Sequence, residues 1–175
     1  MTNLSWEKDH PERKEWSDIL YTIISPNLET FKLAKDITSF RSDFFSLSQE
    51  NQVAVIAQIF CSDAYYESSW DPTCADVDVG NEDDKDSWSI GLWQMSVCDQ
   101  ENYGFKFGFS YDDLLNVEPN AQLAVAIMVK QIKNHGLIML DWDSQKEYVY
   151  WSTLAIHNKY EKTKEIIAEV QGMQL

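Results

Sequence analysis

Basic residues are scarce in this 175-residue chain, which carries 14 Lys and Arg against 29 Asp and Glu, for a formal net charge of −15. Binding of nucleic acid requires clustered Lys and Arg that neutralise phosphates. The composition therefore argues against nucleic acid as a partner. Anionic membrane surfaces are disfavoured for the same reason. A soluble acidic protein is the simplest interpretation of the charge alone.

Cysteine occurs only three times, so at least one thiol stays unpaired unless a second chain contributes. Cys74 and Cys98 flank an acidic stretch and could form a disulfide across it, but the odd count fits a reduced protein equally well. Cys61 falls in an apolar helical pattern, and we expect it to be a small core residue.

Long apolar runs are absent, so no membrane insertion is expected. The amino end, residues 1–11, is polar and charged, unlike a signal peptide, which leaves either a cytosolic protein or one whose export sequence is missing. The length and a hydrophobic share of 44% predict one domain with a substantial core. Seven Trp and eight Tyr suit such a core, and flat rings also line sugar-binding clefts.

The chain is organised around residues 56–72, which begin as a helix because apolar residues recur at spacings of three and four. Pro72 disfavours helical geometry just before it, so Glu67 falls in the last turn of this helix. The negative end of the helix dipole and the flanking Tyr66 and Trp70 both oppose ionisation of that carboxyl, which predicts a raised pKa. Such a carboxylic acid can protonate a leaving oxygen.

A second motif, Gly-Leu-Trp-Gln-Met at residues 91–95, follows Glu-Ser-Ser-Trp-Asp-Pro at residues 67–72. The pair resembles the signature of soluble lytic transglycosylases and goose-type lysozymes, in which Glu-Ser-x-aromatic-x-Pro precedes Gly-Leu-x-Gln and an apolar residue. Residues 118–121 resemble a helix start of that family, and residues 154–158 resemble its Ala-Tyr-Asn-Ala-Gly strip. The four motifs stand in the family's order.

The resemblance implies an α+β, mainly α, lysozyme-like single domain with a small β-hairpin lobe beside the cleft. Residues 1–47 would be an N-terminal helical support, and residues 48–175 the catalytic region of one compact domain. The implied activity is cleavage of the β-1,4 MurNAc–GlcNAc bond of peptidoglycan, without a cofactor or a metal. We expect a monomer, and the resemblance implies a periplasmic or secreted location.

Glu67 would be the catalytic residue, since the family's glutamate acts first as acid and then as base while the sugar's own 6-hydroxyl attacks. Substrate contacts would come from the residues around the matched motifs: Ser68, Ser69, Gln94, Met95, His157 and Asn158. If water attacks instead, a second carboxylate is expected. The candidates for it are Asp76, Asp78, Asp83 and Asp86. Hydrolysis and 1,6-anhydro formation both remain open.

Residues 71–90 carry seven acidic side chains against Lys85 alone, which leaves six excess negative charges beside the proposed acid. Strand-like residues 77–79 and 88–90 flank the turn-forming Gly80 and Asn81, so we expect a β-hairpin. The Asp-x-Asp opening is similar to a calcium loop, but Ser87 stands where the bidentate Glu belongs. The negative charge would attract the ammonium groups of a deacetylated glycan, which predicts a preference for such a substrate.

The last motif departs from the family pattern, because it has no glycine and His157 stands in the place of the tyrosine. This puts an ordinary peptidoglycan substrate in doubt. The alternatives are a catalytically silent glycan-binding module, a chitin-type glycan hydrolase, and a helical interaction protein in which the motifs are coincidental.

Local patterns predict the remaining elements. We expect a loose tail over residues 1–10 and helices over residues 11–25, 27–37, 119–135 and 161–170, with residues 147–158 mostly helical.

Overall fold

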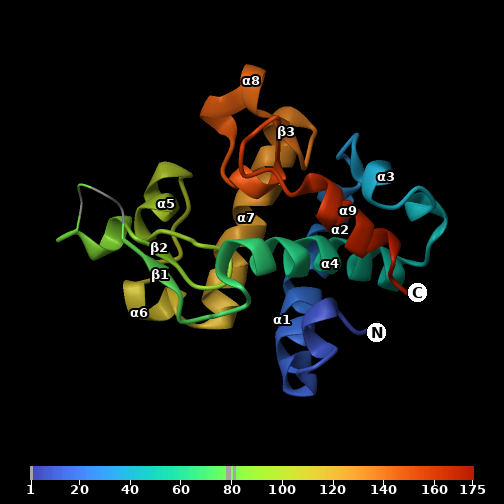
Figure 1. The fold of residues 1–175 in the computed structure, drawn as a ribbon, viewed down its shortest axis with the longest axis horizontal. Coiled ribbons are helices and arrows are strands. Elements are labelled where there is room, and N and C mark those ends of the chain that lie inside the picture. Colours follow the sequence, from blue (N-terminus) through green and yellow to red (C-terminus); the bar gives the residue numbers. More distant parts are fainter. Residues whose placement is uncertain (1, 78–79, 81) are drawn as a thin grey trace.

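Helix α4 (Gln49–Ser68) runs through the middle of the molecule (Figure 1). The structure, a computed structural model, describes residues 2–77, 80 and 82–175. The Ser48 hydroxyl caps α4 by accepting the Asn51 N–H at 3.3 Å. Residues 52–64 are all buried, so this helix is covered on every side rather than along one stripe. It ends at Ser68, and the following Ser69 has a left-handed backbone at φ 56°. Glu67 therefore lies in the last turn, as the sequence predicted.

The second long helix, α7 (Val117–His135), lies against the same core and ends at Gly136 in the left-handed conformation. Helix α1 (Lys14–Ile24) packs against both α4 and α7. An aromatic cluster fills the centre, where the Trp93 ring meets Phe60 and Trp6 edge-on at centroid distances of 6.2 and 6.3 Å. One hydrophobic core therefore includes residues of the N-terminal region and of the remaining chain.

Two predictions for the N-terminal region are wrong. Residues 1–10 are not a loose tail where the structure describes them, since Trp6 is fully buried and donates to the Ser17 hydroxyl at 2.8 Å. The helix expected over residues 27–37 is split into α2 (Leu28–Phe31) and α3 (Ile37–Phe40). The chain leaves the helix between them because Asp36 accepts the backbone N–H groups of Ile138 and Met139 beyond the end of α7.

The expected β-hairpin is present. Strand β1 (Ala75–Asp76) pairs antiparallel with β2 (Ser89–Ile90), with Ala75 opposite Ile90. The pairing begins before the residues expected to form it, and Asp78, Val79 and Asn81 lie outside the described residues. Helices α5 (Val97–Asn102) and α6 (Tyr111–Leu114) complete this lobe, which lies to one side of α4 and α7 (Figure 1).

The C-terminal part contains a second sheet that the sequence did not reveal, in which β3 (Leu140–Asp141) pairs parallel with β4 (Ala155–Ile156). Helix α8 (Trp142–Gln145) follows β3, and α9 (Thr163–Gln171) packs against α4. The mostly helical segment expected over residues 147–158 is wrong, because it holds 3-10 turns and β4 instead. Its Trp151 indole donates to the Trp93 carbonyl at 3.1 Å, so tertiary contacts set its path.

The architecture is α+β and mainly helical, as predicted. Within the described part of the chain, no helix combines the length and apolarity needed to cross a bilayer.

Candidate active site

Glu67 lies half-buried in the last turn of α4, where the helix meets the lobe of β1 and β2. The Thr153 hydroxyl lies 2.8 Å from its Oε1 atom. Burial raises the pKa of Glu67, the Thr153 hydrogen bond opposes that change, and the negative charge of Asp76 adds to it. The environment therefore favours the protonated form, as expected for a general acid, although burial rather than the helix dipole is the main cause.

A second carboxyl group, which the sequence analysis missed, lies one turn earlier on the same helix. Asp63 is 1% exposed, and its Oδ1 lies 2.6 Å from the same Thr153 hydroxyl oxygen. Burial raises the pKa of Asp63 well above its ordinary value, and the charge of Glu67 adds to the shift. The four-residue spacing from Glu67, which puts both carboxyls on one helix face, was the available signal.

The Gly-Leu-Trp-Gln-Met loop is held directly beside the acid. The Ser68 hydroxyl donates to the Leu92 carbonyl at 3.0 Å, so the residue after Glu67 is bonded to this loop. From α7, the Asn120 side chain accepts the Trp93 N–H at 3.0 Å and donates to the Ile90 carbonyl at 2.8 Å. The sequence places Asn120 at a helix start, but its local pattern gives no sign that this side chain positions the loop.

Gly91 is the point of closest approach in this loop. Its φ is +74°, and a Cβ there would lie 2.5 Å from Asn120 Nδ2 and 2.6 Å from the Leu114 carbonyl oxygen. The backbone at the end of the hairpin therefore approaches its neighbours tightly, and only glycine fits there.

Gln94 has a buried amide with one free acceptor. Its Nε2 donates to the Gly91 carbonyl at 2.9 Å, while its Oε1 has no hydrogen-bond partner among the residues that the structure describes. A buried amide oxygen in this state can accept a hydroxyl, amide or ammonium proton from a ligand. The next residue, Met95, is fully buried in the core and hydrogen-bonds through its backbone to Ile90, and its contact with substrate stays a prediction.

The other predicted substrate contacts have different local partners. Ser69 is exposed at the end of α4. The exposed His157 ring has its Nδ1 3.3 Å from Asp141 Oδ2, and the Asn158 carboxamide oxygen accepts the Tyr160 N–H at 2.8 Å. Thus the structure joins Glu67 to the Gln94 loop, whereas His157 and Asn158 bond to residues of the C-terminal segment. A direct role of Ser69, His157 and Asn158 with substrate stays a prediction.

Of the acidic loop residues, Asp76 acts on Glu67, as its effect on the Glu67 pKa shows. Asp83 and Asp86 are exposed, and Asp78 lies outside the described residues.

The only cation of this loop, Lys85, has its ammonium 5.4 Å from the centre of the Tyr111 ring. Within the described chain Lys85 forms no ion pair with an acidic side chain. The negative charge of the loop is therefore not neutralised by its own lysine.

All three cysteines lie within the described residues and are free thiols, so the Cys74–Cys98 disulfide that the sequence allowed is not formed. Cys61 is buried in the core, as expected.

Asp141, Asp143 and His157 bring three possible metal ligands within 4.8 Å of one another. Two of them are exposed, and exposed acidic groups of this kind are common without a bound ion. Glu67 is not a member of the group.

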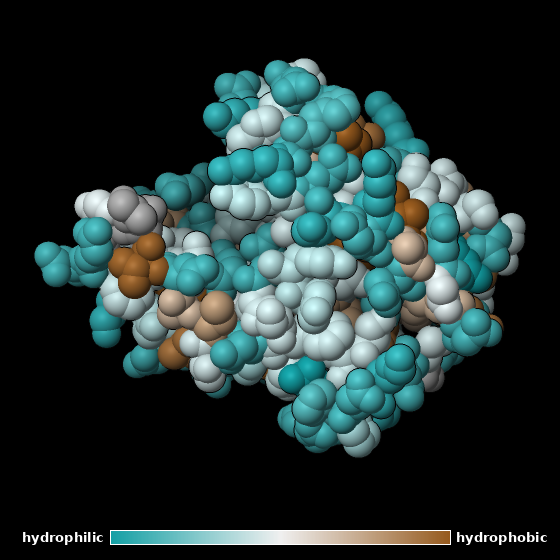
Figure 2. Space-filling view, in the orientation of Figure 1, coloured by the Kyte–Doolittle hydropathy of each residue, from teal (hydrophilic) through white to brown (hydrophobic). Residues whose placement is uncertain are grey.

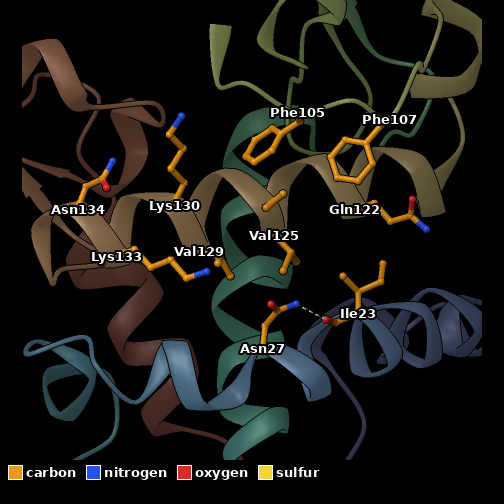
Figure 3. Close-up of a pocket in the computed structure, with 11 residues that line it drawn as sticks. Ile23, Asn27, Phe105, Phe107, Gln122, Val125, Val129, Lys130, Lys133 and Asn134 are labelled. Atoms are coloured by element: carbon orange, nitrogen blue, oxygen red, sulfur yellow. Dashed lines mark hydrogen bonds between the residues drawn. The ribbon is translucent and has the colours of Figure 1, made fainter. Parts of the chain in front are cut away.

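A cavity of about 410 Å³ lies apart from these residues, between α7, the end of α1 and the loop of Phe105 and Phe107 (Figure 3). Apolar side chains share its walls with Asn27 and Gln122, while Lys130, Lys133 and Asn134 lie toward one end, and no carboxyl group lines it. It therefore offers no general acid. The face shown in Figure 2 is mostly hydrophilic and is hollowed between the lobe of β1 and β2 and the segment of β3 and α8.

Comparison with known proteins gives one family and one fold. The profile of the family described as "Transglycosylase SLT domain" matches residues 46–144. Among solved structures, a glutamate-to-glutamine mutant of Bd0314 DslA superposes with a TM-score of 0.79 at 23% identity, covering 99% of this chain and 97% of that chain. Wild-type DslA gives a TM-score of 0.75 at 22% identity, with the same coverage of both chains. A search of curated proteins found no similar sequence.

Proposed function

Because the chain belongs to the transglycosylase SLT domain family, we propose that it cleaves the β-1,4 MurNAc–GlcNAc bond of peptidoglycan with Glu67 as general acid and base. Membership of the family supports a glycan-cleaving enzyme of the lysozyme and lytic transglycosylase kind, with the cell wall as its target. The likeness to DslA, at 23% identity, supports the fold alone. A periplasmic or secreted location belongs to this proposal.

The observation that carries the proposal is the state of Glu67. Its carboxyl is half-buried, it accepts a hydrogen bond from Thr153, and both burial and Asp76 favour its protonated form. Protonation of the bridging oxygen must accompany the growth of positive charge on the sugar ring. A carboxylic acid that keeps its proton near neutral pH is suited to this step.

In the first step the Glu67 proton passes to the bridging oxygen, the bond from that oxygen to the anomeric carbon breaks, and the carboxylate remains. In the second step this carboxylate takes a proton from the attacking hydroxyl, which restores the acid. If the attacking group is the sugar's 6-hydroxyl, the product has a 1,6-anhydro end. If it is water, the product has a reducing end, and Asp76, the loop carboxylate whose charge raises the pKa of Glu67, could serve as the second carboxylate.

The charge beside Glu67 supports a preference for partly deacetylated glycan. Asp76 raises the pKa of the acid, and the remaining carboxylates of the loop lie on its exposed surface. An ammonium group on a deacetylated sugar would be attracted to this charge, whereas an acetamido group would not. Gln94 Oε1 is a buried acceptor that such a donor could use.

The test is digestion of purified peptidoglycan, before and after chemical deacetylation, with mass analysis of the products at low and high salt. We expect faster cleavage of the deacetylated material, with an advantage that shrinks as salt screens the charges. Anhydro ends would identify transglycosylation, and reducing ends would identify hydrolysis. Faster cleavage of the acetylated material would contradict the proposed preference.

The matched variant is Glu67→Gln, which keeps the size and one oxygen of the side chain but has no acidic proton. We expect activity to fall by at least about 10²-fold. Binding to insoluble peptidoglycan should change little. Wild-type protein that binds this material but releases no fragments would instead identify a silent glycan-binding module, the strongest alternative.

A further inference from the structure

Asp63 has no role in the cleavage described above, yet it is one of the most unusual groups in the molecule. It is a carboxyl group in the penultimate turn of α4 with 1% exposure. It also lines a cavity of about 10 Å³ whose other lining residues are all apolar. A carboxylate in such a place would lose most of its hydration. An acidic residue at this place lowers the stability of the fold, so its presence calls for a functional explanation.

The only hydrogen-bond partner recorded for Asp63 within the described chain is the Thr153 hydroxyl. That oxygen lies 2.6 Å from Asp63 Oδ1 and 2.8 Å from Glu67 Oε1. A hydroxyl has one hydrogen, and an ionised carboxylate can only accept. Both contacts can therefore be hydrogen bonds only when at least one of the two carboxyl groups carries a proton.

Burial decides which group that is. Asp63 is enclosed by the core, whereas Glu67 is half-buried at the end of the helix. Removing a charge from water costs more at the enclosed site, so the proton stays on Asp63 when Glu67 ionises. The direction of the Asp63 pKa agrees, since it is raised by burial first and by the charge of Glu67 second.

No neighbouring cation reverses this order. Within the described chain, no Lys, Arg or His nitrogen forms an ion pair with either carboxyl group. The negative charge of Asp76 in β1 raises the pKa of Glu67, so it has the same sign as the two carboxylates. Just before α9, the Lys162 ammonium lies 5.7 Å from the centre of the Tyr66 ring and pairs with neither carboxyl group. That same ring is under the influence of two further acidic groups of α9: Glu165 and Glu169.

We propose that Asp63 is a protonated carboxylic acid at neutral pH that positions the Glu67 carboxyl through Thr153. The Asp63 O–H donates to Thr153 Oγ1, and the Thr153 hydroxyl hydrogen is thereby directed at Glu67 Oε1. Because Oε1 accepts that hydrogen bond, the transferable proton of Glu67 is carried by Oε2. Among the described residues only Oε1 of Glu67 has a side-chain hydrogen-bond partner, which leaves Oε2 for the bridging oxygen of the substrate.

This assignment makes Asp63 a positioning residue, and its catalytic consequence depends on the proposed function of Glu67. The neutral Asp63 also stabilises the state after proton transfer. Once Glu67 has given up its proton, its carboxylate still accepts the Thr153 hydrogen bond, and the pair holds one negative charge rather than two. Two adjacent charges in this half-buried place would repel each other strongly.

Infrared spectroscopy of the protein without substrate tests the protonation directly. We expect the carbonyl stretch of a protonated carboxylic acid near pH 7 in Glu67→Gln, where Glu67 can no longer contribute it, and its loss in the double variant Glu67→Gln/Asp63→Asn. Absence of the band from Glu67→Gln, or its full survival in the double variant, would overturn the proposal. This measurement needs no activity, so an inactive wild type together with the band in Glu67→Gln would reject only the cleavage reaction.

The pH profile of kcat/KM tests the positioning. Asp63→Asn keeps an N–H donor for Thr153 and adds no charge, so the alkaline limb should stay in place. Thr153→Val removes the donor to the Glu67 carboxylate and should move this limb to higher pH by about one unit. Thr153→Ser keeps the hydroxyl and should leave the alkaline limb at its wild-type pH. A shift of the limb to lower pH in Asp63→Asn would show that Asp63 acts through a negative charge, which contradicts the proposal.

Discussion

The hydroxyl of Ser68 and the carbonyl oxygen of Leu92 are hydrogen-bonded at 3.0 Å. This bond joins the residue after the proposed acid to the loop that carries Gln94, although the two lie 24 positions apart. The same hydroxyl lies 3.0 Å from the Ala64 carbonyl of its own helix. The end of α4 and the second motif are therefore one unit, which explains why a serine follows the acid.

Substitution of Ser68 by alanine should loosen that unit. We expect the free energy of unfolding to fall by about 1 kcal/mol, the ordinary contribution of one buried hydrogen bond. Cleavage should fall by up to about tenfold, because the Gln94 loop is no longer fixed relative to the acid. Urea unfolding and cleavage rates measure the two effects.

The matched control is Ser62→Ala on the same helix. Ser62 is 3% exposed, and its hydroxyl accepts from Gln58 at 2.9 Å, away from the second motif. It should lose similar stability and keep its activity. Equal losses of activity in both variants would count against the specific role of the Ser68–Leu92 bond.

Gly91→Ala should be one of the most damaging single substitutions in the chain. The new methyl group would lie 2.5 Å from Asn120 Nδ2, at a backbone φ of +74°. We expect a loss of more than about 2 kcal/mol from the combined clash and backbone strain, together with a loss of activity. The control is Gly108→Ala, where φ is +75° but no atom lies within 4 Å of the added carbon. It should lose only about 1 kcal/mol.

Asp76→Asn tests the electrostatic coupling between the hairpin and the acid. Removal of the Asp76 charge should lower the pKa of Glu67, since that charge raises it. A lower pKa means that the acid form is lost at lower pH, so the alkaline limb of the activity profile should move toward acid. Asp83→Asn makes the same change of charge at another exposed loop position and should leave the limb unchanged. An identical shift in both variants would indicate a general field of the loop instead.

The stability of the protein should respond to pH through Asp63. In the unfolded chain an aspartate titrates near pH 3.9, whereas burial raises the pKa of Asp63 well above this in the folded protein. Between these values the folded state holds the extra proton, so stability falls by about 1.4 kcal/mol per pH unit as pH rises through this window. Asp63→Asn removes this loss.

The difference in unfolding free energy between Asp63→Asn and the wild type should therefore grow in favour of the variant as pH rises from about 4. Urea unfolding across the pH range measures it. A difference that does not change with pH would mean that Asp63 titrates alike in both states.

The thiols offer a test of the redox state. Three thiols should react with a thiol reagent in denaturant without reductant, because all three cysteines are free. In the folded protein Cys98, which is exposed, should react first and the buried Cys61 last. Detection of only one thiol in denaturant would indicate that Cys74 and Cys98 are bridged after all.

Much of the fold could be predicted from local pattern. Apolar spacing and flanking Pro or Gly located α4 and α7, because both helices are long and their ends carry strong stop signals. The hairpin followed from its turn residues, although the paired strands begin earlier than expected. The predictions of short elements were wrong where tertiary hydrogen bonds compete with local propensity. For example, the helix expected over residues 27–37 is interrupted where Asp36 accepts the N–H groups of Ile138 and Met139.

The sequence by itself indicated Glu67 as the candidate acid, its place at a helix end and the family motifs around it, because these depend on residues close together along the chain. Tertiary structure alone decided the partners of that acid. Thr153 lies 86 positions from Glu67, and it reaches both carboxyl groups only because η7 (Ser152–Leu154) packs against α4. Spacing along one helix could place Asp63 and Glu67 on the same face, but only burial in the folded core determines which of them keeps a proton.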